Sequence, residues 1–277
     1  MKICCIPPAG LKSGQSDAYR ALLSKTYSVC RDDTQIITRP LKGGLDRTSD
    51  FEYTYFWFLN KWALVESVIE AEREGCDAAV INSFSDAGVK EARSIVNIPV
   101  VSVSESSMMY ATLLGSRFGI ILPGGLPIML RLLMEQINER GLESRAVAIN
   151  PIRSLPMSTD ELLTKGGKNP QLVAGAVEEV GRELVKDGAD VIICGSTTFG
   201  PLCTATGFVQ LEPEGVPILD CLAVTLKMAE VMVDFREKIG LPFISRGPTY
   251  KLPAEEDTKR IRALFGLSVA AETSFDN

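Results

Sequence analysis

The 277-residue sequence contains no histidine, which excludes every catalytic arrangement that needs an imidazole within this chain. Ser-His-Asp and Cys-His catalysis are therefore absent. The commonest side-chain ligand of transition metals is also missing, and we predict no metal site. Any acid–base chemistry must come from carboxylates, thiols, hydroxyls or lysines.

The sequence also lacks the features of nucleic-acid-binding and membrane proteins. Its net charge is −6 and it has no basic run, so we do not expect a nucleic acid as partner. No apolar stretch approaches the roughly 18 residues of a membrane span, and the first strand meets Pro7 and Pro8 too soon for a signal-peptide core. The seven cysteines are scattered without a CxxC motif, which favours a reducing cytoplasm and free thiols.

Short apolar runs alternate with amphipathic stretches along the whole chain. Apolar runs without polar alternation are typical of parallel strands that are covered on both faces. The pattern predicts an α/β fold with doubly wound parallel sheets. We expect strands near 2–6, 34–39, 77–82, 99–103, 117–122, 145–149, 189–194 and 216–220, and helices near 59–74, 87–96, 105–115, 126–140, 170–187, 222–238 and 254–264.

An internal repeat is the most informative feature. Residues 75–83 read GCDAAVINS and align without gaps on residues 188–196, which read GADVIICGS. Each copy follows a helical stretch rich in charged residues, and each precedes a second strand that begins at a proline, Pro99 or Pro217. We therefore predict two similar lobes related by a pseudo-twofold axis. The first would comprise residues 1–112 and 220–277, and the second residues 113–219.

The repeat ends on Ser83 in one half and on Ser196 in the other. Ligands of open α/β sheets bind outside the carboxyl ends of the strands, where both serines are expected. A pseudo-twofold axis would make the two hydroxyls face each other across a cleft between the lobes. Helix N-termini beyond both serines could bind a small carboxylate or a developing oxyanion. The alternative is that both serines are only turn or N-cap residues.

Around these strand ends the sequence resembles the aspartate/glutamate/hydantoin racemase superfamily, most closely its hydantoin racemase branch. The resemblance extends over nearly the whole chain. It is carried by VINSFSDAG at 80–88, IPVV at 98–101 with Glu105, GSRF at 115–118, GADVIICGS at 188–196 and SRGPTY at 245–250.

This resemblance implies a cofactor-free enzyme in which two cysteines flank the substrate. One removes a proton from a carbon beside a carbonyl, and the other returns a proton to the opposite face. In this chain Ser83 and Ser196 occupy both positions. A thiol has a pKa of about 8.5 and is readily tuned lower, whereas a serine hydroxyl needs an adjacent base. Pro8 lies in a Pro-Pro-Ala-Gly loop where the family usually has Asn-Pro-Asn, which changes the expected carboxylate contact.

Two carboxylates are candidate bases that could assist the serines. Asp86 could orient a hydroxyl or act as base, or it could cap the helix that follows it. Glu105 could be a base in the cleft, or a first-turn acid placed there by the helix dipole. Asn82 could donate to an oxyanion or serve as a strand-end turn residue. The remaining candidates for substrate binding are Phe84, Thr197, Thr198, Arg246 and Tyr250; for Arg246 and Tyr250 the alternative is a packed C-terminal loop.

Two further features have competing interpretations. Cys194 could be a displaced nucleophile, but we interpret both Cys194 and Cys203 as buried core cysteines. The aromatic segment at residues 50–58 could wall a pocket for a ring-shaped substrate or form a subunit contact. We expect a homo-oligomer.

The sequence leaves three functions open, all with a small-molecule ligand. The first is a cofactor-independent isomerase or racemase that moves a proton beside the carbonyl of a hydantoin-like ring or an α-substituted carboxylate. The second is a hydrolase or lyase that acts on a cyclic amide with Ser83 and Ser196 in place of thiols. The third is a binder that has kept the cleft but lost the chemistry.

Overall fold

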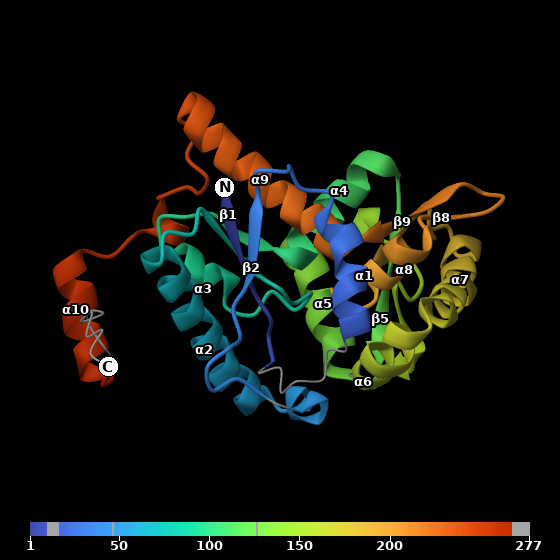
Figure 1. Ribbon diagram of the computed structural model, residues 1–277, viewed down its shortest axis with the longest axis horizontal. Coiled ribbons are helices and arrows are strands. Elements are labelled where there is room, and N and C mark those ends of the chain that lie inside the picture. Colours follow the sequence, from blue (N-terminus) through green and yellow to red (C-terminus); the bar gives the residue numbers. More distant parts are fainter. Residues whose placement is uncertain (10–16, 46, 126, 268–277) are drawn as a thin grey trace.

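The computed structural model describes residues 1–9, 17–45, 47–125 and 127–267, and its main body consists of two β-sheets with helices around them (Figure 1). The helices are α1 (Asp17–Tyr27), α2 (Thr54–Arg73), α3 (Val89–Arg93), α4 (Val103–Leu114), α5 (Pro127–Glu139), α6 (Thr159–Glu161), α7 (Pro170–Lys186), α8 (Gly200–Thr206), α9 (Cys221–Ile239) and α10 (Glu255–Leu264). Short turns of other helix types are η1 (Thr48–Glu52), η2 (Glu143–Arg145), η3 (Leu162–Gly166) and η4 (Pro248–Tyr250). Among the described helices, none is both long and apolar enough to cross a bilayer.

The first sheet has the strand order β2-β1-β3-β4, and all of its pairs are parallel. Its strands are β1 (Lys2–Ile6), β2 (Gln35–Thr38), β3 (Ala78–Ile81) and β4 (Val100–Ser102). β3 is buried on both faces, which explains its uninterrupted apolar sequence. Ala78 and Val80 pack in a core that extends into the second sheet, whereas Ala79 and Ile81 pack in a separate core with α2 and α3.

The second sheet has the strand order β6-β5-β7-β9-β8. Its strands are β5 (Phe118–Gly124), β6 (Ile152–Ser158), β7 (Val191–Cys194), β8 (Gln210–Leu211) and β9 (Val216–Asp220). Only the added edge strand β8 runs antiparallel. Without β8, the four remaining strands repeat the chain order of the first sheet. The predicted α/β fold with two similar lobes is therefore confirmed.

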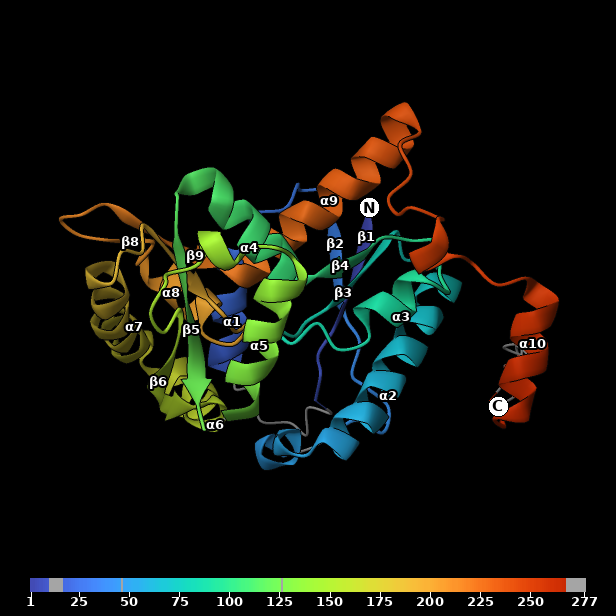
Figure 2. The same ribbon diagram turned by 180° about the vertical axis from the view of Figure 1, so that it is seen from behind.

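The helices connect the two lobes as well as covering them. α2 and α3 cover the outer side of the first sheet and α7 covers the outer side of the second (Figures 1 and 2). α4 and α9 pack against each other, and each reaches the opposite sheet, α4 at β7 and α9 at β3 and β4. α1, which follows β1 of the first sheet, packs on α8 of the second lobe. The boundaries at 112/113 and 219/220 would fall within α4 and inside β9, and they stay a prediction.

Some predicted elements differ from the structure. The strand expected near 145–149 is wrong: this stretch forms only an isolated bridge from Ala146 to Phe118, and the edge strand is β6. β6 escaped prediction because its polar and apolar residues alternate and it contains Pro156. Neither α1 nor α8 was predicted. α8 opens with a Gly-Pro pair that resembles a loop, although proline is favoured in a first helical turn.

Candidate functional site

The two strand-end serines lie in matching turns. Ser83 follows β3, and its Oγ accepts a hydrogen bond from the backbone N–H of Ser85 at 3.4 Å. Ser196 follows β7, and its Oγ accepts from the backbone N–H of Thr198 at 3.2 Å. Both serines are half-buried. The repeat seen in the sequence thus extends to the local hydrogen bonding of each serine with the residue two positions later.

A hydrogen bond joins the two strand ends directly. The hydroxyl of Thr197 donates to the backbone carbonyl oxygen of Asn82 at 3.3 Å, although the two residues are 115 positions apart. The fold therefore brings the neighbours of Ser83 and Ser196 together at one place. Asn82, Ser83, Ser196 and Thr197 form what we call the strand-end group.

Ser85 is a member of this neighbourhood that sequence reasoning missed. Its hydroxyl lies 2.8 Å from the hydroxyl of Ser83, and its side chain is buried. Its backbone carbonyl accepts a hydrogen bond from Nε2 of Gln136, which comes from α5. The Ser-x-Ser spacing was the only signal in the sequence that pointed to this pair.

Asp86 holds the loop that carries Ser83. Its buried carboxylate accepts from the hydroxyls of Ser102 and Ser104, from the backbone N–H of Ser104 at 3.1 Å, and from Arg140 at 2.9 Å. Burial raises the pKa of Asp86, although these hydrogen bonds and Arg140 act in the opposite direction. These contacts lead to the β4–α4 junction and, through Arg140, to the end of α5. Asp86 therefore binds the first turn of α4, whose N-cap is Ser102, and does not cap the α3 helix that follows it in sequence.

The second lobe has a comparable buried carboxylate at Asp220. It accepts from the hydroxyls of Thr26 at 2.8 Å and Thr204 at 2.9 Å, and it caps α9. Burial raises the pKa of Asp220 as well. Gly200, which begins α8 beyond the Ser196 loop, lies so close that an added Cβ would be 2.8 Å from the Asp220 carboxylate. Each strand-end loop is thus fixed by a buried acid.

The predicted residues Glu105, Arg246 and Tyr250 gather in a different place, around Arg93. Arg93 forms a 2.6 Å ion pair with Glu105. Arg246 donates to the backbone carbonyl of Arg93 at 2.8 Å and to that of Tyr250 at 3.3 Å. Other Arg246 bonds reach residues 96–97, in the turn before β4. No hydrogen bond among the described residues links these three to the strand-end group, and packing of the C-terminal segment accounts for the contacts of Arg246.

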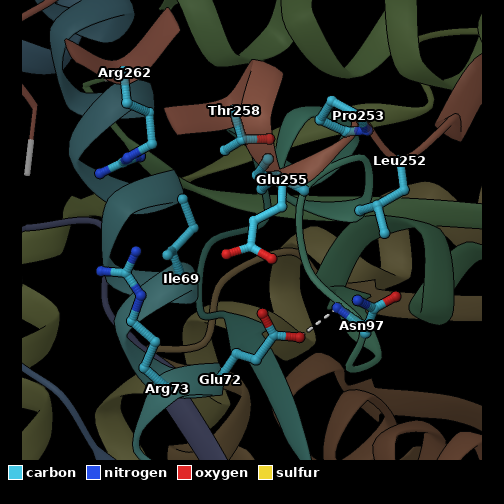
Figure 3. Close-up of a pocket in the computed structure, with 10 residues that line it drawn as sticks. Ile69, Glu72, Arg73, Asn97, Leu252, Pro253, Glu255, Thr258 and Arg262 are labelled. Carbon is cyan, nitrogen blue, oxygen red and sulfur yellow. Dashed lines mark hydrogen bonds between the residues drawn. The ribbon is translucent and has the colours of Figure 1, made fainter. Parts of the chain in front are cut away.

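A pocket lies beside this C-terminal segment, between α2 and α10 (Figure 3). Glu72 accepts a hydrogen bond from the backbone of Asn97 across its floor, and the carboxylate of Glu255 points toward it. Arg262 of α10 forms two hydrogen bonds of 2.6 and 2.7 Å with Glu66 of α2. The pocket is lined by the second half of α2, by the turn before β4 and by residues 252–262 of the C-terminal segment. It therefore lies at the edge of the sheet opposite to Ser83.

The other predicted residues take mainly structural positions. The backbone carbonyl of Pro8 accepts from Nδ2 of Asn60 at 2.9 Å, which ties the end of β1 to α2. Phe84 is buried in the core shared by the two sheets. Cys194 and Cys203 are both buried, and their mutual hydrogen bond together with burial raises the pKa of the Cys194 thiol. A buried neutral thiol of this kind is a poor nucleophile.

The aromatic segment forms η1 and the start of α2. Trp57 donates to the backbone carbonyl of Phe51 and packs against both hydrophobic cores. Tyr55 and Phe58 are each 66% exposed. Trp57 therefore has a packing role, whereas pocket wall and subunit contact both stay predictions for the exposed rings. The homo-oligomer likewise stays a prediction.

Comparison with known proteins shows the family of this chain. The model of the Asp/Glu/Hydantoin racemase family matches residues 16–229. The chain belongs to this family. It is 29% identical over 232 residues to a hydantoin racemase of Pseudomonas sp. (strain NS671), covering 83% of this chain and 84% of that one. Its fold is similar to that of an allantoin racemase from Klebsiella pneumoniae, with a TM-score of 0.71 at 22% identity over 91% of this chain and 94% of the other. It is also similar to a mutant of arylmalonate decarboxylase, with a TM-score of 0.55 at 14% identity over 84% and 93%.

In this member of the racemase family, the strand-end group offers hydroxyls and amides rather than charges. The nearby carboxylate of Asp86 is neutralised by Arg140, and Glu105 is neutralised by Arg93. No cluster of three or more acidic or thiol side chains that could hold a metal ion occurs in the part of the chain that the structure describes. The chemistry available at this place is hydrogen bonding to a carbonyl and transfer of protons between hydroxyls.

Proposed function

We propose that this member of the racemase family is a cofactor-independent isomerase that moves a proton on a carbon beside a carbonyl. Its substrate would be a small hydantoin-like ring or an α-substituted carboxylate, bound between the loops of Ser83 and Ser196. The observation that carries the proposal is the hydrogen bond from Thr197 to the Asn82 carbonyl, because it joins the two halves of the repeat beside these serines.

The turns around the serines support a role as hydrogen-bond donors. Each Oγ accepts a backbone N–H, so one lone pair of the hydroxyl is used. The Ser196 proton is left to donate, and the Ser83 proton is left to donate when Ser85 is the donor in the bond between the Ser83 and Ser85 hydroxyls. Two hydroxyls that donate to the substrate carbonyl would stabilise the enolate that forms when the neighbouring carbon loses its proton. Donors of this kind, aimed at developing negative charge, contribute about 3–4 kcal/mol each in well-studied enzymes.

The proton itself would pass to a solvent hydroxide through the hydroxyls of Ser83 and Ser85: Ser83 Oγ takes the proton from carbon as its own proton moves to Ser85 and the Ser85 proton moves to the hydroxide, and in this step Ser196 is the donor to the carbonyl. The hydroxyls of Ser83 and Ser85 are 2.8 Å apart, so a proton can pass from one to the other. A serine hydroxyl is several pKa units less acidic than a thiol, and each unit costs about 1.4 kcal/mol. Neither Asp86 nor Glu105 hydrogen-bonds to this pair among the described contacts, so we expect slow turnover compared with that of a thiol pair.

A hydrolase or lyase is the second candidate, and the same hydroxyl geometry favours it. Two donors that polarise a cyclic amide carbonyl would also assist attack of water or carbon–carbon cleavage, and neither reaction needs a thiolate. A binder without turnover is the third candidate.

Proton exchange in D₂O tests these alternatives. We would incubate the enzyme with 5-substituted hydantoins and follow loss of the C5 proton by NMR, and ring opening by mass spectrometry. Exchange without ring opening supports the isomerase, and ring-opened product supports the hydrolase. Thermal stabilisation without either supports the binder. Ser83→Ala and Ser196→Ala should each abolish exchange, whereas Ser28→Ala, an exposed serine after α1, should not. Full exchange in both strand-end variants would refute the proposal.

A further inference from the structure

The side-chain oxygen Oδ1 of Asn82 is buried and has no hydrogen-bond partner among the described residues. A buried carbonyl oxygen without a partner costs about 1–3 kcal/mol. The other buried side-chain atoms in this state are one hydroxyl in α2, at Ser67, and the Nε atoms of four arginines that are bonded through their other nitrogens. Of these atoms, Asn82 Oδ1 alone belongs to the strand-end group.

The position of Asn82 directly after β3 indicates where this oxygen faces. Its backbone N–H donates to the carbonyl of Ile6 at 2.8 Å, which continues the pairing of β3 with β1. Side chains alternate along a strand, so Asn82 shares the face of Ala78 and Val80. That face packs in the core common to both sheets. The unpartnered oxygen therefore belongs to the side of the strand end that meets the second lobe.

The oxygen atom of Asn82 can accept a hydrogen bond and has no donor among the described residues, so it favours a ligand that donates one. The neighbouring hydroxyls of Ser83 and Ser196 can donate to a ligand carbonyl, whereas that of Thr197 already donates to the Asn82 backbone carbonyl, so the group as a whole is suited to a carbonyl with an N–H beside it. A cyclic amide or ureide has this arrangement. A carboxylate has only acceptor oxygens, and one placed against Asn82 Oδ1 would be repelled.

We propose that Asn82 determines specificity by accepting the ring N–H of a cyclic amide substrate through Oδ1. The inference rests on the proposed function and selects the ring over the α-substituted carboxylate. Sites built to bond an N–H or O–H group strongly reject analogues that lack it, because the site then keeps an unpaired polar atom.

The test compares a 5-substituted hydantoin with its two N-methyl derivatives. For the wild-type enzyme, methylation of the recognised nitrogen should lower kcat/KM for C5 exchange by about 5–150-fold, the factor that corresponds to the cost of about 1–3 kcal/mol for a buried unpaired polar group. Methylation of the other nitrogen should have less effect. Thermal shift in the presence of each compound gives a binding readout that does not depend on turnover.

Two variants assign this discrimination to Asn82. Asn82→Leu removes the acceptor, so its preference for the parent ring should fall to within about threefold. Asn82→Asp keeps an acceptor of the same shape and should keep the preference. Asn138→Leu, an exposed position on α5, serves as the control. Equal exchange with both N-methyl derivatives in the wild type, or discrimination that persists in Asn82→Leu, would overturn the role of Asn82 and leave the proposed function standing. Absence of both binding and exchange with every ring would overturn both.

Discussion

Replacing Asp86 by asparagine would test whether this residue is a scaffold or a base. The asparagine side chain has the same shape and, like aspartate, tolerates the positive φ of 53° at this position. Its amide nitrogen, however, would face donors where the carboxylate now accepts from Ser102, Ser104 and Arg140. We expect Asp86→Asn to destabilise the fold and to loosen the loop that carries Ser83.

The magnitude follows from the burial of the pair. The side chain of Asp86 is 6% exposed and that of Arg140 19%. Removing one partner of a buried ion pair typically costs about 3–5 kcal/mol. The cost of the substitution is smaller than this, because burial raises the pKa of Asp86. The charged carboxylate is itself destabilised by desolvation, and the neutral asparagine avoids that penalty. We therefore expect a loss of about 2–3 kcal/mol, which for a chain of this size lowers Tm by roughly 4–12 °C.

Urea unfolding and C5 exchange, measured on the same preparations, decide between the two roles. A scaffold predicts lower stability with exchange that is reduced but measurable. A base predicts wild-type stability with exchange abolished, and that result would refute the scaffold role of Asp86. Asp257→Asn is the matched control, because Asp257 is 63% exposed and its pair with Arg260 lies on the surface. Surface changes of this kind stay within about 0.5 kcal/mol.

Three further predictions follow from other contacts. Ser83→Cys combined with Ser196→Cys should raise the C5 exchange rate at pH 8 by at least about tenfold, because a thiol pKa lies near 8.5; an unchanged rate would contradict proton transfer at these positions. Burial alone would raise the pKa of Glu230, but hydrogen bonds from Lys227 and Thr34 and from a backbone N–H outweigh it and lower the pKa. The stability that Glu230 provides is therefore present above its unfolded-state pKa and lost as pH falls through the lowered folded value, so Glu230→Gln should cost stability in urea at pH 7 and progressively less as the pH is lowered into the acidic range. Arg246→Ala should increase proteolysis of residues 240–254 while leaving C5 exchange unchanged. Loss of exchange in this variant would show that Arg246 takes part in substrate binding and would contradict its purely structural role.

The sequence predicted those parts of the fold in which local pattern and burial agree. β3 and β7 are apolar throughout because both faces of each are covered, and their repeated sequences revealed the two lobes. β6 was missed because an edge strand needs only one apolar face. α8 was missed because its first residues, Gly200 and Pro201, are also typical of loops.

The candidate site was predictable only where a member is marked by the sequence pattern immediately around it. Ser83 and Ser196 each end a recognisable strand, and the strand-end rule located both. Contacts from distant segments carry no such local signal. Gln136 and Arg140 lie 51 and 54 positions from their partners Ser85 and Asp86, and nothing around them in the sequence distinguishes them from other polar helix residues. The role of Asp86 was ambiguous for the same reason.

The comparison of Asp86 with Asp220 shows what the two lobes have in common. Alignment of the repeat places Asp220, at the end of β9, opposite Ser102 at the end of β4. In the first lobe the loop supplies the carboxylate and the strand end supplies the hydroxyl, whereas in the second lobe the strand end supplies the carboxylate and Thr204 of α8 supplies the hydroxyl. The carboxylate acceptor thus lies in the loop after the serine in the first lobe and on the neighbouring strand in the second, and the hydroxyl donor lies on the opposite partner in each case. Both lobes keep a hydrogen bond between the segment that follows the serine and the end of the neighbouring strand. The shared requirement is thus a buried hydrogen bond that fixes each loop, and a search for matching residue types alone would overlook it.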